Sequence, residues 1–435
     1  MMTSNKSKNS SSPAPNFVRN NKNFKKLWQN WYGARIAILG FGREGKDTLL
    51  FLNKLFPKKK IGIADRSCSA KPSNQKEKNI KLHLGKNYLS ALKNYDVIIK
   101  SPGIPFKILP KSVLSKITTQ TEIFFNNCPG KIIGITGTKG KSTTSSWIYQ
   151  TLKSGGVKAH LVGNIGQPVL TSLLKAKKDD VFVYELSSHQ LCSLKKSPQI
   201  AVLLNIYPEH LDYYRSFNDY VNAKANIAKY QNKNNCLIYN ARDLLVKKIA
   251  NKSQAKKIPI QGKYYELNKA AAKEVAKIFR VPALKELAFL PHRLELVGRF
   301  KGIEFYNDSL STIPETAIEA LDFLGNKVQT LILGGFDRGL SFEKLALRIK
   351  KSQVKTLILF PTTGQRIYRE LSPVSNRGQF SVFFVKNMET AVKLAYQHTK
   401  KGKVCLLSPA SPSFGLFKDY EERGNLFKKF ISMLR

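Results

Sequence analysis

Short apolar runs alternate with longer amphipathic stretches along this chain. In the first third, apolar runs at 34–40, 61–64 and 96–100 have the length and composition of buried strands. Between the first two runs, residues 46–55 repeat their apolar positions with the spacing of an amphipathic helix. This order predicts βαβ units, in which helices cover a sheet of parallel strands.

The alternation continues to the end of the chain, so the predicted fold class is α/β with mainly parallel sheets. With 435 residues the chain is too long for one core, and we expect two or three domains. A boundary is predicted near 285–291, where Pro282 and Pro291 flank a short predicted helix. Further strands are predicted at 131–135, 181–185, 200–205, 235–239, 303–307, 329–333, 355–359, 381–385 and 403–407.

Basic residues outnumber acidic ones by 73 to 29, which gives a formal net charge of +44. Because the lysines are spread along the chain, we interpret them as a solubilising surface and expect no specific nucleic acid partner. A nucleic-acid-binding P-loop ATPase is the alternative, but the sequence shows neither clustered arginines nor a helix-turn-helix pattern. Residues 1–30 are rich in Ser, Asn and Lys and contain no acid, so they predict a disordered basic tail.

The five cysteines are scattered and form no Cys-x-x-Cys pair, as is typical of reduced thiols in the cytoplasm. No apolar run approaches the ~18 residues that a bilayer-spanning helix needs, so membrane insertion is not expected. The polar N-terminal stretch lacks the apolar core of a signal peptide. The expected location is therefore the cytoplasm.

A glycine-rich loop follows the apolar residues 131–133 and reads Gly-Ile-Thr-Gly-Thr-Lys-Gly-Lys-Ser-Thr-Thr over 134–144. In such a loop, backbone N–H groups and the N-terminus of the next helix face phosphate oxygens. We expect Lys141 to reach the β- and γ-phosphates of ATP and the Ser142 hydroxyl to bind Mg²⁺. A Gly/Ser-rich turn without a ligand is the alternative, and the order of strand, glycines, Lys and Ser argues against it. The other predicted ATP contacts in this loop are Gly137, Thr138, Lys139, Gly140 and Thr143.

A second glycine-rich turn lies nearer the N-terminus, where residues 40–45 read Gly-Phe-Gly-Arg-Glu-Gly after a predicted strand. The next predicted strand ends at Asp65, about 20 residues further on, as in dinucleotide-binding βαβ units. The strand at 96–100 ends in Ser-Pro-Gly-Ile-Pro over 101–105. Because ligands bind at the carboxyl ends of parallel strands, these turns predict a nucleotide site, although not one for NAD in particular.

Further polar residues follow predicted strands. Glu185 ends one strand and is a candidate Mg²⁺ ligand opposite Ser142, with a helix cap as the alternative role. His210 follows another strand in an acidic turn, where a metal or phosphate role and a structural role both remain open. Arg293 and Asp308 are candidates to contact the phosphate and ribose of a nucleotide at a domain junction, although their spacing alone is weak evidence.

Taken in order, several motifs resemble those of the Mur ligase family, over about residues 34–430. Each motif is modest alone, but their common order leaves little room for coincidence. Besides the loop at 134–144, they are Gly-Asn-Ile-Gly (163–166), Glu-Leu-Ser-Ser-His-Gln-Leu (185–191), Glu-His-Leu-Asp (209–212), Ala-Lys (223–224), His-Arg-Leu-Glu (292–295), Asn-Asp-Ser (307–309) and Leu-Ser-Pro-Ala-Ser-Pro-Ser-Phe (407–414).

The resemblance implies a UDP-binding Rossmann-like domain at 31–114, a central ATP-binding P-loop ATPase-like domain at 115–290 and a Rossmann-like C-terminal domain at 291–435. It implies an ATP- and Mg²⁺-dependent ligase of peptidoglycan precursor synthesis, which we expect to be a monomer. In the glutamate-adding branch, the substrates are UDP-N-acetylmuramoyl-L-alanine and glutamate, with D-glutamate expected. The alanyl carboxylate becomes an acyl phosphate, which the glutamate amine attacks.

The resemblance also implies roles for single residues. The implied catalytic residues are Lys141, His210 and Lys224, and a carbamate on Lys224 would turn a cation into a metal-binding anion. The implied metal ligands are Ser142, Glu185, His210 and the carbamylated Lys224, and the remaining nucleotide contacts are Asn268, Arg293 and Asp308. The predicted substrate contacts are Gly42, Asp65, Ser101, Gly103, Asn164, Ser187, Gln190, Thr312, Arg338, Ser413 and Tyr420.

The sequence departs from the family pattern mainly on the side expected to hold glutamate. Leu310 stands where a lysine is common, Arg338 corresponds to a usual lysine, and Gly415 replaces a frequent Asp. His189 stands where Phe is usual, and Tyr264-Tyr265 replaces a His-Asn pair. The open alternatives are L-glutamate, another amino acid or a folylpolyglutamate-type substrate. A catalytically inactive scaffold is disfavoured because the residues of the predicted ATP site are intact.

Overall fold

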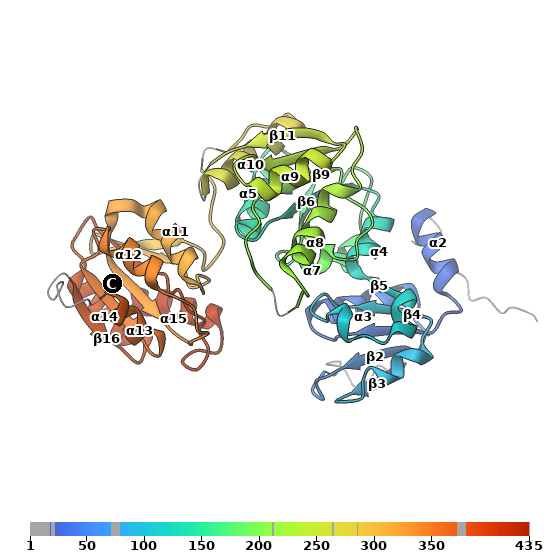
Figure 1. The fold of residues 1–435 in the computed structure, drawn as a ribbon, viewed down its shortest axis with the longest axis horizontal. Helices are drawn as coiled ribbons and strands as arrows, with labels where there is room; N and C mark the ends of the chain where they lie inside the picture. Colours follow the sequence, from blue (N-terminus) through green and yellow to red (C-terminus); the bar gives the residue numbers. More distant parts are fainter. Residues whose placement is uncertain are drawn as a thin grey trace, which may run out of the picture. The chain divides into compact units, whose positions relative to one another are not determined.

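The computed structural model describes residues 18, 22–70, 79–210, 213–262, 265–284, 286–371 and 380–434. Three sheets are formed by these residues, and helices connect most successive strands (Figure 1). The chain divides after Leu284 into two compact units, called the N-terminal unit and the C-terminal unit below. The N-terminal unit holds the first two sheets, and the C-terminal unit holds the third.

The first sheet has the strand order β3-β2-β1-β4-β5, and its neighbouring strands are parallel. The three apolar runs predicted from the sequence, β1, β2 and β4, form its interior. β5 pairs with β4 beyond the predicted domain limit at residue 114, so the sheet continues to Thr119. The elements are β1 (Ile36–Leu39), α3 (Arg43–Leu55), β2 (Ile61–Asp65), β3 (Ile80–Leu84), η1 (Ser90–Asn94), β4 (Val97–Lys100), η2 (Phe106–Ile108), η3 (Lys111–Lys116) and β5 (Ile117–Thr119).

The second sheet has the order β11-β10-β9-β6-β8-β7 and is also parallel. β6 lies between β9 and β8, so the ends of both neighbours flank the loop that follows it at the carboxyl edge. Its strands are β6 (Lys131–Thr136), β7 (Ala159–Gly163), β8 (Val181–Glu185), β9 (Ile200–Leu203), β10 (Cys236–Asn240) and β11 (Lys256–Ile260). Its helices are α5 (Lys141–Ser154), α6 (Val169–Leu173), α7 (Ser188–Leu191), α8 (Phe217–Lys229), α9 (Leu244–Lys252) and α10 (Tyr265–Phe279).

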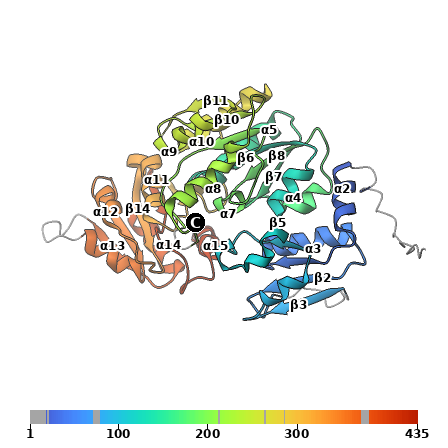
Figure 2. The same ribbon diagram turned by 45° about the vertical axis from the view of Figure 1, so that its right-hand side comes forward.

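Within the N-terminal unit, α4 (Gln120–Asn127) connects the first two sheets, which lie next to each other in Figure 2. Phe124 of α4 packs edge-on against Tyr184 of β8, with ring centroids 5.5 Å apart. The buried Asp47 carboxylate of α3 accepts the Leu170 N–H of α6 at 2.9 Å. The two sheets therefore share one hydrophobic core.

The predicted disordered tail at 1–30 is wrong in part, because Lys22–Trp31 forms the helix α2. Phe24, Leu27, Trp28 and Trp31 recur at helical spacing and belong to the core that the two sheets share or pack against it. The basic composition of the segment obscured this apolar stripe in the sequence. Residues 1–17 and 19–21 lie outside the described residues, so the prediction for them stays untested.

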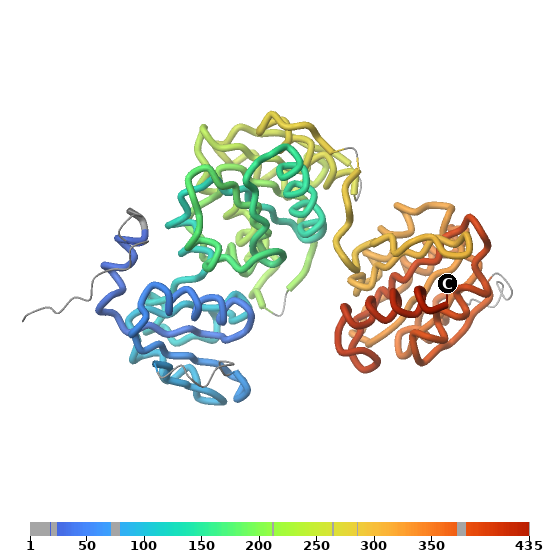
Figure 3. The backbone as a smooth tube through the Cα atoms, turned by 180° about the vertical axis from the view of Figure 1, so that it is seen from behind, coloured from blue at the N-terminus to red at the C-terminus, as the bar shows by residue number. Residues whose placement is uncertain are grey.

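The C-terminal unit holds the third sheet, in the order β12-β13-β17-β14-β15-β16. Only its β12–β13 pair, among the described strands, is antiparallel. The last helix, drawn in red in Figure 3, lies beside β13. The short helix predicted between Pro282 and Pro291 is wrong, since the described residues of that segment form none. The elements are β12 (Glu295–Phe300), β13 (Ile303–Asn307), α11 (Pro314–Leu324), η4 (Gly325–Lys327), β14 (Val328–Gly334), α12 (Glu343–Lys350), β15 (Thr356–Phe360), α13 (Thr363–Leu371), β16 (Ser381–Phe384), α14 (Met388–His398), β17 (Val404–Leu407) and α15 (Tyr420–Met433).

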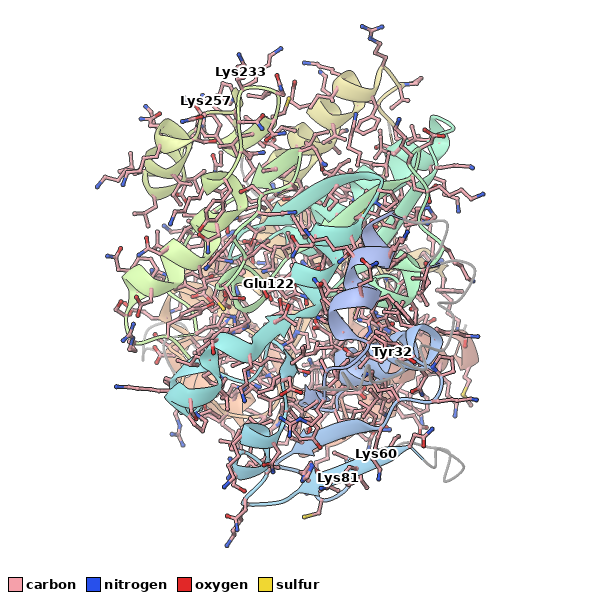
Figure 4. All side chains as sticks on the ribbon, turned by 90° about the vertical axis from the view of Figure 1, so that its right-hand side faces the viewer. Tyr32, Lys60, Lys81, Glu122, Lys233 and Lys257 are labelled. Atoms are coloured by element: carbon pink, nitrogen blue, oxygen red, sulfur yellow. The ribbon has the colours of Figure 1, made fainter. Side chains whose placement is uncertain are left out.

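Basic side chains are spread over the surface of the N-terminal unit. Lys60, Lys81, Lys233 and Lys257 are exposed, and in Figure 4 the first two lie at the opposite end of the unit from the last two. This distribution fits the interpretation of the charge as a general property of the surface. Within the described parts of the chain, no helix has the length and apolar content needed to cross a bilayer.

Candidate active site

The glycine-rich loop begins where β6 ends and leads directly into α5, as the sequence predicts. Gly140 precedes the helix with a φ of 82°, a left-handed conformation that glycine adopts without strain. A Cβ at this position would lie 2.6 Å from Oδ1 of Asn268 on α10. The structure thus brings Asn268, a predicted nucleotide contact, against the loop and places Lys141, Ser142 and Thr143 in the first turn of α5.

Two lysine amino groups converge on this loop. Nζ of Lys141 donates to the carbonyl oxygens of Gly137 (3.0 Å) and Thr138 (2.9 Å), and Nζ of Lys224 donates to that of Gly137 (2.8 Å). Lys224 is 2% exposed, and burial, together with the nearby charge of Lys141, holds its pKa well below the usual value. Two lysine amines at one carbonyl suit the loop to an anion such as a phosphate chain.

The neighbouring strand and helix hold the loop in shape. Asn205, which follows β9, accepts the Lys139 N–H at its Oδ1 (2.7 Å) and the Thr138 N–H at its backbone oxygen (2.8 Å). The Thr138 hydroxyl lies 2.9 Å from the Tyr220 hydroxyl of α8, and Nζ of Lys139 donates to Oε1 of Glu209 at 2.9 Å. The backbone N–H groups of Thr138 and Lys139 are thus held by acceptors of the protein, which fixes the shape of the loop.

Glu185 ends β8 with its side chain inside the protein, and the residue is 3% exposed. Its backbone lies in register with Ile135 of β6, next to the start of the glycine loop. Its buried Oε2 has no hydrogen-bond partner among the described residues. A buried carboxylate oxygen, the hydroxyl of Ser142 and a phosphate chain are the ligands that Mg²⁺ prefers. The described chain contains no cluster of three His, Cys, Asp or Glu side chains suited to a metal, so ligands beyond Ser142, Glu185 and the predicted His210 would come from the nucleotide, water or a modified Lys224.

His210 lies in the turn after β9 with a φ of 58°, which is uncommon for a residue other than glycine. Its Nε2 lies 3.8 Å from Oε2 of Glu209, and its ring centroid lies 4.7 Å from that of His189. The His189 ring also packs on Tyr213, whose hydroxyl donates to backbone oxygens in the turn after β4. His189, which stands where the family usually has Phe, thus belongs to an aromatic cluster that extends from the His210 turn to the first sheet. Residues 211–212 of the motif lie outside the described residues.

The N-terminal glycine turn is built differently from the loop after β6. Asp65 accepts the Phe41 N–H at Oδ2 (2.6 Å) and the Ser67 N–H at Oδ1 (2.7 Å), so both carboxylate oxygens bind protein. The Ser101 hydroxyl donates to the Gly40 carbonyl oxygen at 2.9 Å. Asp65 and Ser101 therefore shape the turn itself. The two other predicted contacts of this sheet have open space where a Cβ would stand: Gly42 and Gly103.

The remaining predicted contacts of the N-terminal unit lie where its two sheets meet. Nη1 of Arg43, in the glycine turn, donates to the Asn164 carbonyl oxygen at 3.0 Å. Ser187 and Gln190 form the capping box that starts α7, and Nε2 of Gln190 donates to Oε1 of Glu44 at 2.9 Å. Burial raises the pKa of Glu44 to about 7, an effect that the Gln190 hydrogen bond partly offsets. Asn164, Ser187 and Gln190 are thus brought together with the N-terminal glycine turn.

In the C-terminal unit, Asp308 follows β13 and is buried. Its Oδ1 accepts the Leu294 N–H (3.0 Å), and its Oδ2 accepts the Ser408 hydroxyl (2.7 Å). Burial raises the pKa of Asp308 to about 7, although the hydrogen bond from Ser408 and the charge of Arg293 act in the opposite direction. Tyr420, at the start of α15, also lies within electrostatic range of Arg293. The structure thus brings together Arg293, Asp308 and Tyr420.

The other predicted contacts of this unit lie in three turns at one edge of its sheet. Arg338 lies in the turn after β14, with its guanidinium carbon 5.8 Å from the ring centroid of Phe414. Ser413 is buried in the turn after β17, and Thr312 lies in the turn after β13. Because β13, β17 and β14 are neighbours in the sheet, these turns are adjacent at its carboxyl edge.

Several residues that shape these sites were not predicted from the sequence. Asn205 and Lys100 directly follow or end apolar strands, the same pattern that identified Glu185, so this pattern could have found them. Lys100 is buried, and its Nζ donates to two carbonyl oxygens of the turn that follows β4. Arg423 is fully buried in the middle of a charged segment of α15, and nothing in the sequence pattern distinguishes it from its exposed neighbours.

Comparison with protein families and known proteins gives matches along most of the chain. The Mur ligase middle domain matches residues 135–301, and the Mur ligase glutamate ligase domain matches residues 292–411. The chain is 32% identical to a UDP-N-acetylmuramoylalanine–D-glutamate ligase of Acetivibrio thermocellus, over 94% of this chain and 98% of the relative. A ligase of the same name from Clostridium tetani is also 32% identical, over 95% of this chain and 100% of the relative.

Solved structures with a similar fold come from the same group of proteins. The MurF ligase of Thermotoga maritima in complex with ADP matches with a TM-score of 0.57 and 17% identity, over 93% of this chain and 97% of that structure. The UDP-N-acetylmuramate–alanine ligase MurC of the same organism matches with a TM-score of 0.57 and 14% identity, over 92% of this chain and 100% of that structure. These likenesses confirm the predicted α/β architecture.

Proposed function

The chain belongs to the Mur ligase family, and on this premise we propose that it is an ATP-dependent ligase that adds D-glutamate to UDP-N-acetylmuramoyl-L-alanine in peptidoglycan precursor synthesis. The observation that carries the proposal is the convergence of Lys141 and the buried Lys224 on the Gly137 carbonyl at the end of β6. The names of the relatives that align over nearly the whole chain support the substrate and the D enantiomer.

The proposed reaction has two steps. A carboxylate oxygen of the alanyl group attacks the γ-phosphorus of ATP and ADP leaves, which gives an acyl phosphate. The glutamate amine then attacks the acyl carbon, phosphate leaves, and the nitrogen loses a proton as the amide forms. Phosphorylation is needed because a carboxylate is a poor electrophile without a good leaving group. Lys141 and the N–H groups at the start of α5 orient the transferred phosphoryl group and stabilise its charge.

Ser142 and Glu185 are the residues we propose to hold Mg²⁺, with His210 as a further ligand. The ion offsets the negative charge of the phosphates when it is bound. Burial of Lys224 favours its neutral amine, which can attack CO₂ and release a proton to form a carbamate. The carbamate would place an anion within electrostatic range of Glu185, where two carboxylate-type groups suit a divalent cation.

We propose that the carboxyl-edge turns of the first sheet bind the UDP part of the substrate. Because Asp65 already binds two backbone N–H groups, its role is to hold the glycine turn, while the open side of Gly42 faces the ligand.

The predicted cytoplasmic location and monomeric state stay predictions. The further proposed contacts are Ser101 and Gly103 for UDP, Asn164, Ser187 and Gln190 for the muramoyl group, Gly137, Thr138, Lys139, Gly140, Thr143, Asn268, Arg293 and Asp308 for ATP, and Thr312, Arg338, Ser413 and Tyr420 for glutamate.

The first test is phosphate release from Mg-ATP with UDP-N-acetylmuramoyl-L-alanine, measured with D-glutamate and separately with L-glutamate. We expect release with D-glutamate, and a decrease of about 100-fold or more in Lys141→Ala, because a preorganised charge at the phosphoryl group is lost. Lys131→Ala removes an exposed lysine from the start of the same strand and should leave the rate unchanged. Release with L-glutamate alone would assign the other enantiomer, and no release with either would overturn the proposal.

A further inference from the structure

Arg423 is the largest fully buried side chain in the described part of the molecule, with 0% exposure. It lies on the first turn of α15 but points into the protein, between the helix and the sheet edge. None of the ion pairs found among the described residues includes it. A buried charge that makes no direct ion pair is costly to the fold, so its position here calls for an explanation.

The guanidinium bonds two turns of the sheet edge and touches a third. Its Nε donates to the Ser309 hydroxyl (3.0 Å), its Nη2 to the Ser309 carbonyl oxygen (2.7 Å) and its Nη1 to the Ser411 carbonyl oxygen (3.0 Å). A Cβ on Gly335 would lie 3.3 Å from Nη1. Ser309, Ser411 and Gly335 lie in the turns after β13, β17 and β14, which are neighbours in the sheet. One side chain therefore joins two adjacent turns and packs against the third.

Further bonds tie the same turns to one another. The Phe336 N–H donates to the Pro412 carbonyl oxygen at 2.9 Å, which joins the turn after β14 to the turn after β17. The Ser309 hydroxyl donates to the Tyr420 carbonyl oxygen at 2.8 Å, which joins the turn after β13 to α15. Thr312, Arg338 and Ser413, the residues proposed to hold glutamate, lie in these turns.

The hydrogen-bond partners of Arg423 are uncharged, and the buried Asp308, next to Ser309 in the chain, is the carboxylate whose charge acts on it. Three of the five N–H groups of a guanidinium are used in the bonds above. Burial lowers the pKa of Arg423 to about 9, which still leaves it charged at neutral pH. The turns that would hold glutamate thus rest on a buried cation that is bonded to their backbone oxygens.

We propose that Arg423 is a positioning residue that holds the turns of the glutamate side together, so that the residues proposed to bind glutamate keep their places. The inference rests on the proposed function. It differs from the direct contacts predicted at Thr312, Arg338, Ser413 and Tyr420, because Arg423 acts from beneath them.

The test compares Arg423→Met, Arg423→Lys and the control Lys429→Met, which removes an exposed charge from the same helix. For each protein, KM is measured separately for glutamate, ATP and UDP-N-acetylmuramoyl-L-alanine. We expect Arg423→Met to raise KM for glutamate at least tenfold and the other two constants by less than threefold. Arg423→Lys should recover part of the loss, because it keeps the charge without the planar fork of donors, and Lys429→Met should behave as the wild type.

A uniform rise of all three constants, or a loss of thermal stability with unchanged KM for glutamate, would overturn the proposal. If Arg423→Met does not fold, the test rests on Arg423→Lys. An unchanged KM for glutamate and an unchanged melting temperature in that variant would show that the guanidinium bonds to the turns do not matter, and the proposal would be wrong. If the wild type itself shows no glutamate-dependent phosphate release, the proposed function and this proposal fall together. Release in the wild type that the variants do not alter would remove this proposal alone.

Discussion

The two glycine-rich turns of the N-terminal unit follow the same strand–loop–helix pattern but differ in the charges around them. In the turn at 40–45, the Asp65 carboxylate of the protein accepts a loop N–H group. In the loop at 137–140, the amines of Lys141 and Lys224 both donate to the Gly137 carbonyl oxygen, and the Glu209 carboxylate binds the side chain of Lys139. The first turn therefore has a carboxylate of the protein bonded to its backbone, whereas lysine amines converge on the second, which suits it to a phosphate chain.

This difference separates two ways in which a glycine-rich turn can serve a nucleotide. The turn at 40–45 is held by Asp65 and by close packing, since a Cβ on Gly45 would lie 2.2 Å from the Gly40 carbonyl oxygen. It offers shape and an open side at Gly42. The loop at 137–140 offers charge, as a triphosphate requires. Glycine spacing alone does not distinguish the two roles, and the surrounding acids and lysines do.

The sharpest test of the comparison is Lys224→Met, which removes one of the two amines and keeps a chain of similar length. We expect phosphate release to fall by about 100- to 1,000-fold, because a charged or carbamylated group at the phosphate site is lost. Thermal stability should stay the same or rise, because a buried basic group with no carboxylate bonded to it is replaced by an apolar one. Melting curves and rates measured on the same preparation check both parts.

The Gly137 carbonyl oxygen still accepts Lys141 in this variant, so the loop itself should keep its shape. Lys229→Met, at the exposed end of the same helix, is the matched control and should keep the wild-type rate. Activity near the wild-type level in Lys224→Met would mean that the loop does not depend on the second amine, and the contrast between the two turns would lose its basis.

Gly45→Ala tests the packing of the first turn. The new Cβ would meet the Gly40 carbonyl oxygen at 2.2 Å, so we expect a loss of about 2 to 3 kcal/mol in the free energy of unfolding. Gly42→Ala is the matched control, because its Cβ would find no atom within 4 Å and its φ of −77° suits any residue. The control should change stability by less than about 0.5 kcal/mol. Instead, it should raise KM for the UDP substrate, since the added methyl group lies on the open side of the turn.

Equal stability of the two alanine variants, measured by denaturant unfolding, would contradict the assigned packing role of Gly45. An unchanged KM in Gly42→Ala would remove Gly42 from the proposed UDP site and leave the packing role of Gly45 intact.

The position of a strand within its sheet explains which strands the sequence could predict. Strands inside the three sheets are covered on both faces, so they read as continuous apolar runs, and all of them were predicted. The strands that the sequence did not predict, β3, β5, β7, β11 and β12, lie at sheet edges. β11, for example, contains two lysines and a proline, which an edge tolerates and an apolar pattern does not reveal.

The site divides in a similar way. Residues at the ends of apolar strands, such as Glu185 and Asp308, could be predicted from their place in the pattern. Lys224 could not be singled out among 73 basic residues without the family resemblance, because its burial follows from the packing of α8 and not from its neighbours in sequence. Arg423 shows the same limit, since a buried arginine and an exposed one have the same sequence neighbourhood.

The smallest expected effect concerns Glu44, in the turn at 40–45, and it depends on pH. Burial raises the pKa of Glu44 from 4.5 to about 7, and its Oε2 has no hydrogen-bond partner among the described residues. A folded-state pKa above the unfolded one means that this group stabilises the fold below pH 4.5 and that its contribution is lost as the pH rises through 7.

The variant Glu44→Gln keeps an oxygen that can accept the hydrogen bond from Gln190, and it has no charge to bury. We therefore expect the free energy of unfolding of Glu44→Gln to lie closer to that of the wild type at pH 5. At pH 8.5 it should exceed the wild-type value by about 1 to 3 kcal/mol. Denaturant unfolding at the two pH values, with the exposed Glu266→Gln as the control for the loss of one carboxylate, checks this expectation. The same stability difference at both pH values would show that the pKa of Glu44 is not raised in the fold. Glu44 would then be exposed to water, and burial of an acid would no longer distinguish the first turn from the second.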